Sequence, residues 1–133
     1  NDLHQQSLSE MMLMQGKSLA EANVVLLTSG ESEAAEWPTK VQIRLSAVIS
    51  EAITNVIRHA HAHQVEMIFE QNPNGYLVEI QDDGHSKSYK RTGSNGISGM
   101  QQRMKEVNGT FTINHNRQGT QVSLTLPKEQ LSQ

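Results

Sequence analysis

The sequence predicts an α+β fold, a two-layer sandwich in which helices cover one face of a mixed sheet. Two observations lead to this fold class. Four of the five strand-like segments come in two pairs, each joined by a short turn containing Asn and Gly, and long amphipathic segments lie before and between the pairs. Strands joined by such turns pair antiparallel, whereas a doubly wound parallel sheet needs single strands that alternate with helices. A chain of 133 residues is long enough for one domain with a real core.

The first part of the chain predicts a helix, a strand and a loop, in that order. Residues 3–22 carry apolar side chains around more than half of a helical circumference, which is typical of a helix taken from a larger bundle. Residues 24–28 are mainly aliphatic and predict a short strand. The acidic residues 29–36 predict a loop. Pro38 follows it and favours the start of a helix, because proline is tolerated in the first turn.

A long amphipathic helix is predicted from residue 39 to about residue 62. At about 100° per residue, its apolar side chains fall on one broad arc. Glu51, Asn55 and Arg58 form a polar ridge on the other side, with Asn55 at the border of the apolar arc. Asparagine is a weak helix former. In the middle of a helix and beside the core, it is therefore either a solvated border residue or a ligand.

The rest of the chain predicts two hairpins with a helix between them. The loop before that helix, residues 85–95, has hardly any apolar group. Asn and Gly in the turns favour tight hairpin connections, and Asn108 with Gly109 favours the end of the helix. The expected segments are strands at 65–70 and 76–81, a helix at 97–107, and strands at 110–114 and 120–126.

Composition excludes several classes of function. Eleven basic and fourteen acidic residues give a net charge of −3, without the basic stripe that nucleic-acid binding requires. The absence of cysteine excludes disulfides and thiolate metal sites. No apolar run approaches the ~20 residues that span a bilayer. The sequence begins at Asn1 without an initiator Met, so we expect it to be a piece of a longer protein. We also expect this piece to be a cytoplasmic domain, with any membrane contact made by missing upstream segments.

Three short stretches could share one ligand. Asp82 stands at the end of a predicted strand, where its carboxylate can accept a hydrogen bond from a buried amino group, and Gly84 allows a close approach. Residues 93–100 are glycine-rich and lead into a helix, where free N–H groups and the helix dipole favour phosphate. Residues 119–120 lie in the turn before the last strand. Each stretch alone is also compatible with an ordinary turn, loop or hairpin.

In their order and spacing behind a mid-helix Glu-x-x-x-Asn, these stretches resemble the ATP-binding catalytic domain of bacterial sensor histidine kinases. The same superfamily holds gyrase-type and mismatch-repair ATPases and implies the Bergerat-type fold. The likeness covers about residues 23–127 and is particularly similar to the subfamily of nitrate-sensing and thermosensing kinases. The matching stretches are residues 51–60 for the N box and residues 82–84, 96–100 and 119–120 for the three glycine boxes.

The resemblance implies that the site binds ATP together with Mg²⁺. Asn55 would coordinate Mg²⁺ through its amide oxygen, which is the kind of ligand that this ion prefers. Asp82 would accept a hydrogen bond from the amino group of adenine. Gly84 and Thr120 would line the same pocket.

The other implied site residues lie around the phosphates, beneath a lid formed by residues 85–95. Glu51 would act as a general base, polarise the acceptor histidine or orient a metal-bound water. Arg58 and His59 would neutralise charge. The second glycine box and its surroundings supply the remaining cofactor-binding residues, which are Gly93, Gly96, Ile97, Gly99 and Met100.

The implied activity is that of a histidine autokinase. We expect residues 1–22 to be the end of a dimerisation helix or a linker, and residues 23–133 to be the catalytic domain. The γ-phosphoryl group of ATP would pass to a histidine on the dimerisation domain of a homodimer, outside this sequence, and then to a response regulator. Two alternatives stay open: a serine kinase of the anti-sigma-factor type, and a nucleotide-binding interaction module without phosphotransfer.

Two positions depart from the family pattern. Ser94 stands where kinases of this subfamily usually have glycine, which affects the expected lid conformation. His4 is followed by Gln5 and not by an acidic residue, and only one helix fits between it and the first strand. We therefore do not expect His4 to be the phosphoacceptor.

The remaining histidines do not predict a metal site. Residues 59, 61 and 63 are alternating histidines, and residues two apart on a helix point in different directions. His85 and His115 are expected in loops. None of these residues is expected to bind a transition metal.

Overall fold

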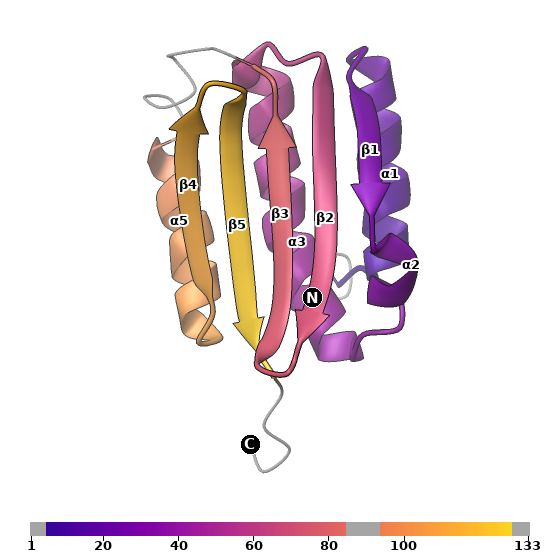
Figure 1. Cartoon of the computed structure of the whole chain (residues 1–133), viewed down its shortest axis with the longest axis vertical. Helices are drawn as coiled ribbons and strands as arrows, with labels where there is room; N and C mark the ends of the chain where they lie inside the picture. Colours follow the sequence, from indigo (N-terminus) through magenta and orange to yellow (C-terminus); the bar gives the residue numbers. More distant parts are fainter. Residues whose placement is uncertain (1–4, 85–93, 129–133) are drawn as a thin grey trace.

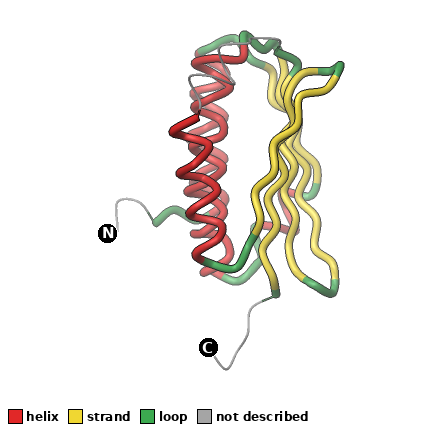
Figure 2. Tube along the Cα trace, turned by 90° about the vertical axis from the view of Figure 1, so that its left-hand side faces the viewer, coloured by secondary structure: helices red, strands yellow, loops and turns green. Residues whose placement is uncertain are grey.

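A computed structural model describes residues 5–84 and 94–128 of the chain. It forms two layers, with a sheet on one side and helices on the other (Figures 1 and 2). In chain order the elements are α1 (Leu8–Glu21), β1 (Val25–Ser29), α2 (Glu31–Ala34), α3 (Thr39–Asn55), the π-helix η2 (Val56–Ala60), β2 (Gln64–Asn72), β3 (Gly75–Asp82), α5 (Ser94–Glu106), β4 (Thr110–Asn116) and β5 (Gly119–Pro127).

The five strands form one mixed sheet in the order β1-β2-β3-β5-β4. β1 and β2 are parallel and are joined by the segment that contains α3, whereas every other neighbouring pair is antiparallel. The predicted α+β sandwich with a mixed sheet is therefore confirmed. The order places β3 and β5 side by side and antiparallel, so the last residues of β3 and the first residues of β5 lie next to each other at one end of the strands.

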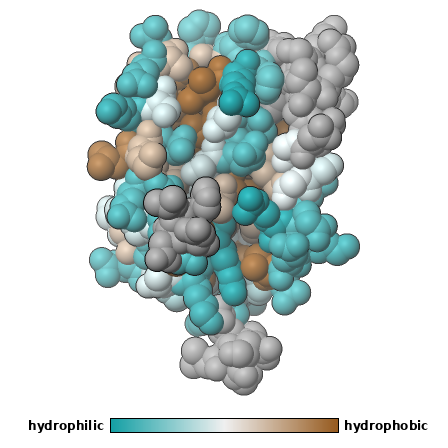
Figure 3. Space-filling view, turned by 180° about the vertical axis from the view of Figure 1, so that it is seen from behind, coloured by the Kyte–Doolittle hydropathy of each residue, from teal (hydrophilic) through white to brown (hydrophobic). Residues whose placement is uncertain are grey.

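The core lies between the sheet and α3, which stands behind the middle strands (Figure 1). Every second side chain of β2, β3 and β5 is buried against the helices, and α3 presents its apolar arc to them. Figure 3 shows the outer surface of the helical layer, where hydrophilic residues predominate between smaller hydrophobic areas. The largest fully buried side chains of this part of the core are Leu45, Ile49, Ile53, Met67, Ile80 and Leu124.

The first helix shares this core. α1 begins at Ser7 with a capping box, in which the Ser7 side chain accepts from the Glu10 N–H and the Glu10 side chain accepts from the Ser7 N–H. Leu8, Met11, Met12 and Leu19 are buried, and α1 packs against α3 and β1. The first turn of α1 is therefore stabilised by its own cap at Ser7. A domain boundary after residue 22 stays a prediction.

Three segments differ from the expected ones. The expected acidic loop contains the short helix α2, and Gly30, the residue just before this helix, has a φ of 80°. The Thr28 hydroxyl donates a hydrogen bond to the Glu31 carboxylate in the first turn of α2. The long helix changes at Val56 from α to π geometry and ends at His61, whose φ is 53°. α5 begins at Ser94, so the last two residues of the expected loop are helical. No helix among the described residues is long and apolar enough to cross a membrane.

Candidate functional site

Asn55 is a buried polar residue at the end of α3. Its side chain is 5% exposed, and its Nδ2 atom has no hydrogen-bond partner among the described residues. Leaving a buried polar group without a partner costs about 1–3 kcal/mol, and such groups are rare in folded proteins. The next residue begins η2, and π turns within helices occur frequently at functional sites. The Nδ2 atom of Asn55 is thus held inside the molecule without a partner in the described part of the chain.

The first turn of α5 lies against the polar side chains of α3. A Cβ atom on Gly96 would lie 3.3 Å from Glu51 Oε2, 3.5 Å from Asn55 Nδ2 and 3.6 Å from Asn55 Oδ1. The first N–H groups of a helix lack partners within the helix and carry the positive end of its dipole. The structure therefore brings a carboxylate, an amide and a helix N-terminus to one place.

Asp82 ends β3 as a buried acid. Its side chain is 2% exposed, and its Oδ1 atom accepts hydrogen bonds from the N–H of Gly84 at 2.9 Å and the N–H of Thr120 at 3.3 Å. Burial raises the pKa of the Asp82 carboxyl above its usual value, and these two hydrogen bonds oppose the rise. Both bonds use the same oxygen. Oδ2 is the atom that can accept from a bound ligand.

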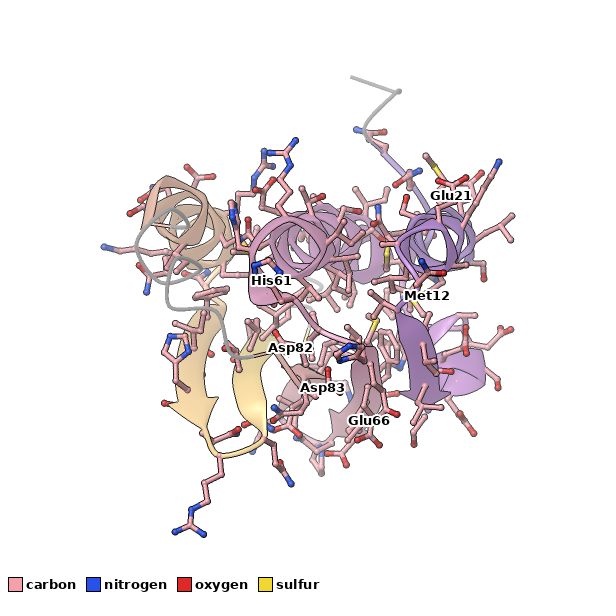
Figure 4. All side chains as sticks on the ribbon, turned by 90° about the horizontal axis from the view of Figure 1, so that it is seen from above. Met12, Glu21, His61, Glu66, Asp82 and Asp83 are labelled. Carbon is pink, nitrogen blue, oxygen red and sulfur yellow. The ribbon has the colours of Figure 1, made fainter. Side chains whose placement is uncertain are left out.

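Two glycines let the backbone close around Asp82. A Cβ on Gly84 would lie 1.9 Å from the carbonyl oxygen of Ala60, so the chain after β3 packs directly on the end of η2. A Cβ on Gly119 would lie 2.1 Å from the carbonyl oxygen of Asp82. Figure 4 looks onto this end of the molecule and shows Asp82 and Asp83 at the end of the sheet, next to His61 at the end of the helix. Asp82 is thus at the same end of the fold as the last turns of the α3–η2 helix.

Comparison with known families matches most of the chain. The family model described as "Histidine kinase-, DNA gyrase B-, and HSP90-like ATPase" covers residues 40–130, a range that includes every part of the site described above. The chain belongs to this family. It is an ATPase domain of the histidine kinase type in its fold, and ATP binding is the property that the family shares by name.

Relatives of this ATPase domain include sensor kinases. The chain is 32% identical over 106 residues to the sensor histidine kinase YxjM of Bacillus subtilis (strain 168), and the aligned region covers 79% of this chain and 26% of that protein. It is 28% identical over 117 residues to the sensor histidine kinase DesK of the same organism, covering 84% of this chain and 30% of that protein. The chain thus spans about a quarter to a third of the length of these relatives.

Solved structures share the fold of the ATPase domain. The histidine kinase AdeS of Acinetobacter baumannii matches with a TM-score of 0.69 at 13% identity, over 92% of this chain and 64% of that chain. The blue-light activated histidine kinase of Erythrobacter litoralis EL346 matches with a TM-score of 0.68 at 17% identity, over 94% of this chain and 40% of that chain. At these identities the likeness concerns the two-layer α+β architecture.

The second aspartate of the ATPase domain has a different role from the first. Asp83 Oδ1 accepts from the N–H of His63 at 2.7 Å and the N–H of Gln64 at 3.0 Å, which holds the turn between η2 and β2. Burial acts to raise the pKa of the Asp83 carboxyl, but these hydrogen bonds outweigh it and leave the pKa below its usual value. Asp83 therefore stabilises the turn after η2, whereas the two hydrogen bonds described for Asp82 join the ends of β3 and β5 through Oδ1.

The remaining predicted site residues occupy several environments. Arg58 is exposed and His59 partly exposed on η2, and Ile97 is partly buried in α5. Met100 is 1% exposed and belongs to the core, whereas a Cβ on Gly99 would meet nothing within 4 Å. Gly93 lies outside the described residues, as does the predicted lid except for its last two residues.

The donor set fits a magnesium ion better than a transition metal. Glu51 and Asn55 offer a carboxylate and an amide oxygen close to Gly96, and Mg²⁺ prefers such oxygen ligands together with water and phosphate oxygens. The described parts of the chain contain no group of three or more His, Cys, Asp or Glu residues arranged to hold a metal. Mg²⁺ bound here would therefore take most of its ligands from the nucleotide and from water.

One residue of the site was missed by sequence reasoning. His115 lies in β4 and not in a loop, and its Nδ1 atom is 2.9 Å from the Thr120 hydroxyl oxygen. The signal was available in the short turn between residues 116 and 119. A tight hairpin at this position places the residue before the turn opposite the residue after it, so His115 pairs with Thr120.

Proposed function

We propose that this ATPase domain is the catalytic part of a sensor histidine kinase, which binds ATP with Mg²⁺ and transfers the γ-phosphoryl group to a histidine on a dimerisation domain outside this sequence. That domain would form a homodimer in the whole cytoplasmic portion, and a response regulator would take the phosphoryl group next. The observation that carries the proposal is the buried side chain of Asn55, whose Nδ2 atom has no hydrogen-bond partner among the described residues and which lies against Gly96 at the start of α5. The sensor kinases among its relatives support the phosphotransfer step.

The base of the nucleotide is assigned to the end of β3. Asp82 accepts from the amino group of adenine through Oδ2, while Oδ1 stays bonded to the backbone of Gly84 and Thr120. The buried position of Asp82 strengthens this choice. A base that presents an acceptor at this point would leave the carboxylate unpaired in a site with little water, which is unfavourable.

The phosphates are assigned to the gap between α3 and α5. The N–H groups of the first turn of α5, around Gly96 and Ile97, bind phosphate oxygens, and the absence of a side chain on Gly96 leaves room for them above Asn55. Asn55 would hold Mg²⁺ through its amide oxygen, and the ion would supply positive charge that neutralises the phosphates during transfer.

Transfer requires little covalent chemistry from the domain itself. A nitrogen of the acceptor histidine attacks the γ-phosphorus, the bond between that phosphorus and the β–γ bridging oxygen breaks, and ADP leaves. Such a reaction depends on positioning and on charge neutralisation. Arg58 and His59, exposed and partly exposed on η2, supply positive charge, and the exposed carboxylate of Glu51 polarises the incoming histidine or orients a metal-bound water.

Titration calorimetry with ATP and ADP, each with and without Mg²⁺, tests the nucleotide site. We expect both nucleotides to bind and Mg²⁺ to strengthen ATP binding. Asn55→Leu keeps about the size of the side chain but has no oxygen that can bind a metal, and it should remove the dependence on Mg²⁺. Asn74→Leu makes the same chemical change in an exposed turn and should bind like the unmodified chain. If Asn55→Leu also behaves like the unmodified chain, the metal assignment is wrong.

A separate assay tests phosphotransfer. ATP labelled on its γ-phosphate is incubated with the chain and the dimerisation domain of its own full-length protein. Acid-labile label on a histidine of that domain would support the autokinase. Label on a serine of a supplied protein would instead establish the serine kinase, and nucleotide binding without any transfer would indicate an interaction module.

A further inference from the structure

Three side chains form a row across neighbouring strands, at the end of the sheet that carries the site. Asp82 of β3 pairs directly with Thr120 of β5, and Thr120 pairs directly with His115 of β4. Side chains of directly opposite residues project from the same face of a sheet and lie close enough to interact. The buried acid and the exposed histidine are therefore connected through one threonine.

Hydrogen bonds run along this row. The Thr120 N–H donates to Asp82 Oδ1 at 3.3 Å, and the Thr120 hydroxyl oxygen is 2.9 Å from His115 Nδ1. A threonine hydroxyl has one proton and two acceptor positions. If Nδ1 carries a proton, His115 donates to the hydroxyl oxygen, and the hydroxyl proton can be donated elsewhere. If Nδ1 carries none, the hydroxyl donates to the ring and offers a ligand only a lone pair.

We propose that His115 is a positioning residue for the nucleotide base, which donates from Nδ1 to the Thr120 hydroxyl and so directs the hydroxyl proton toward a ring nitrogen of bound adenine. This inference rests on the nucleotide site proposed above. Thr120 is 4% exposed, so its hydroxyl has little access to bulk water and depends on a protein partner for its orientation. His115 is the residue that provides one.

The resulting pattern matches adenine and not guanine. Adenine presents an amino donor beside a ring nitrogen that accepts, and this edge faces an accepting Asp82 carboxylate and a donating Thr120 hydroxyl. Guanine presents a carbonyl oxygen beside a ring N–H, which is the reverse order. A site whose buried polar groups are arranged for one pattern rejects the other because its groups are left unpaired. His115 thereby contributes to the selection of adenine through Thr120, without contacting the base itself.

The test compares three histidine variants by titration calorimetry with ADP. His115→Leu removes the donor, and we expect ADP binding to weaken roughly 3- to 10-fold, the effect of losing one hydrogen bond of ordinary strength. His115→Asn keeps an N–H at a similar position and should stay within about twofold of the unmodified chain. His61→Asn is the matched control, because His61 is exposed at the helix end and its φ of 53° suits asparagine.

Two further ligands separate a role at the base from a structural one. Binding of inorganic tripolyphosphate with Mg²⁺, which has no base, should be the same for His115→Leu and the unmodified chain. The ratio of the GDP to the ADP dissociation constant should fall in His115→Leu, because one of the groups that select adenine is lost. Thermal unfolding of all three variants should be close to that of the unmodified chain, since both histidines are exposed.

Several outcomes would overturn the inference. His115→Leu that binds ADP as tightly as the unmodified chain would show that the hydrogen bond does not serve the base. A variant that loses tripolyphosphate binding as much as ADP binding would show a structural role instead. An unmodified chain that binds ADP and GDP equally would remove the base selection but leave the nucleotide site standing. A chain that binds none of these ligands would refute the proposed function itself, and this inference with it.

Discussion

Asp82 and Asp83 are neighbours in the sequence, yet the fold shifts their acidities in opposite directions. Burial raises the pKa of Asp82, whereas hydrogen bonds from the backbone of residues 63 and 64, which outweigh burial there, lower the pKa of Asp83. The cause is geometric. Asp82 faces the interior and Asp83 faces the turn after η2. Their charges therefore affect the stability of the domain with opposite signs.

This difference predicts how stability depends on pH. The raised pKa of Asp82 means that the folded chain binds this proton more tightly than the unfolded chain. Its contribution to stability is fully present below the ordinary value of 3.8 and is lost as the pH rises through the raised pKa. At pH 7, Asp82→Asn should therefore raise the melting temperature of the nucleotide-free domain. The same variant should weaken ADP binding by about 10- to 100-fold, because a charge-assisted hydrogen bond is lost.

Asp83→Asn is the control for that measurement. Its lowered pKa gives stability that is present above 3.8 and lost as the pH falls through the folded value. At pH 7 this variant should melt at a lower temperature than the unmodified domain. Melting curves of both variants between pH 3 and pH 8 measure these two effects. Melting temperatures that shift in the same direction for both variants at pH 7 would contradict the opposite pKa shifts of Asp82 and Asp83.

Asn55 should show a conflict between stability and binding. Its buried amide nitrogen lacks a partner among the described residues, and alanine is a better helix former. We expect Asn55→Ala to raise the free energy of unfolding of the nucleotide-free domain by about 1 kcal/mol in urea titrations. Mg²⁺-dependent ATP binding should be lost in the same variant. A destabilised variant would show that the amide has a partner after all.

At the scale of elements, a single glutamine connects the first helix to the helix of the site. Gln42 in α3 is 8% exposed, and its side chain accepts from the N–H of Leu8 and donates to the carbonyl oxygens of Ala35 and Trp37. It joins the start of α1, the chain after α2 and the beginning of α3. Together with the apolar packing of α1 against α3, this contact fixes where α1 begins relative to the helix that carries Asn55.

Gln42→Ala should consequently loosen α1. The variant leaves buried backbone groups without partners, and we expect a loss of about 2–3 kcal/mol in the free energy of unfolding. Hydrogen exchange should increase first at Leu8 and in the rest of α1. Gln101→Ala, on the exposed side of α5, should change neither quantity. Equal protection of α1 in Gln42→Ala and the unmodified chain would be inconsistent with this role.

The contact between Gly84 and η2 predicts another effect at this scale. Gly84→Ala would place a Cβ 1.9 Å from the Ala60 carbonyl oxygen, so the end of β3 must move away from η2. We expect a loss of about 1–3 kcal/mol in stability, together with weaker ADP binding, because Asp82 moves with this segment. In Gly16→Ala the added methyl meets only Leu26 Cδ2 at 3.9 Å, and this change within α1 should stabilise the domain by about 0.5–1 kcal/mol. Urea titrations of both variants provide the comparison.

At the scale of the whole molecule, the predictable parts are those with local signals. The Asn- and Gly-containing turns and the helical periodicity of residues 39–62 predicted the hairpins and the main helix, and the fold class is confirmed. α2 was missed because four residues carry too short a pattern, and η2 because an α periodicity does not reveal a wider turn. The burial of Asn55 and the pairing of His115 with Thr120 depend on packing between distant segments, which no local pattern shows.

Bound nucleotide should stabilise the whole domain, because the site takes residues from both layers. With Mg²⁺ and free ADP at about 100 times its dissociation constant, the free energy of unfolding should rise by about 2.7 kcal/mol. Removing Mg²⁺ with EDTA should reverse part of this gain in unmodified chain. In Asn55→Ala the gain should be the same with and without EDTA. A thermal-shift series with these four conditions measures the effect.

The wider turn at Val56–Ala60 has one last consequence, which concerns how this helix tolerates deletions. Losing one residue from an ordinary helix rotates everything beyond it by about 100° and usually ruins the packing. A π turn already contains a surplus residue, so its loss allows the segment to relax into a regular α-helix. Such a shortened chain would keep its core but turn Arg58 and His59 toward new directions, so it would alter the groups proposed to face the phosphates while staying folded.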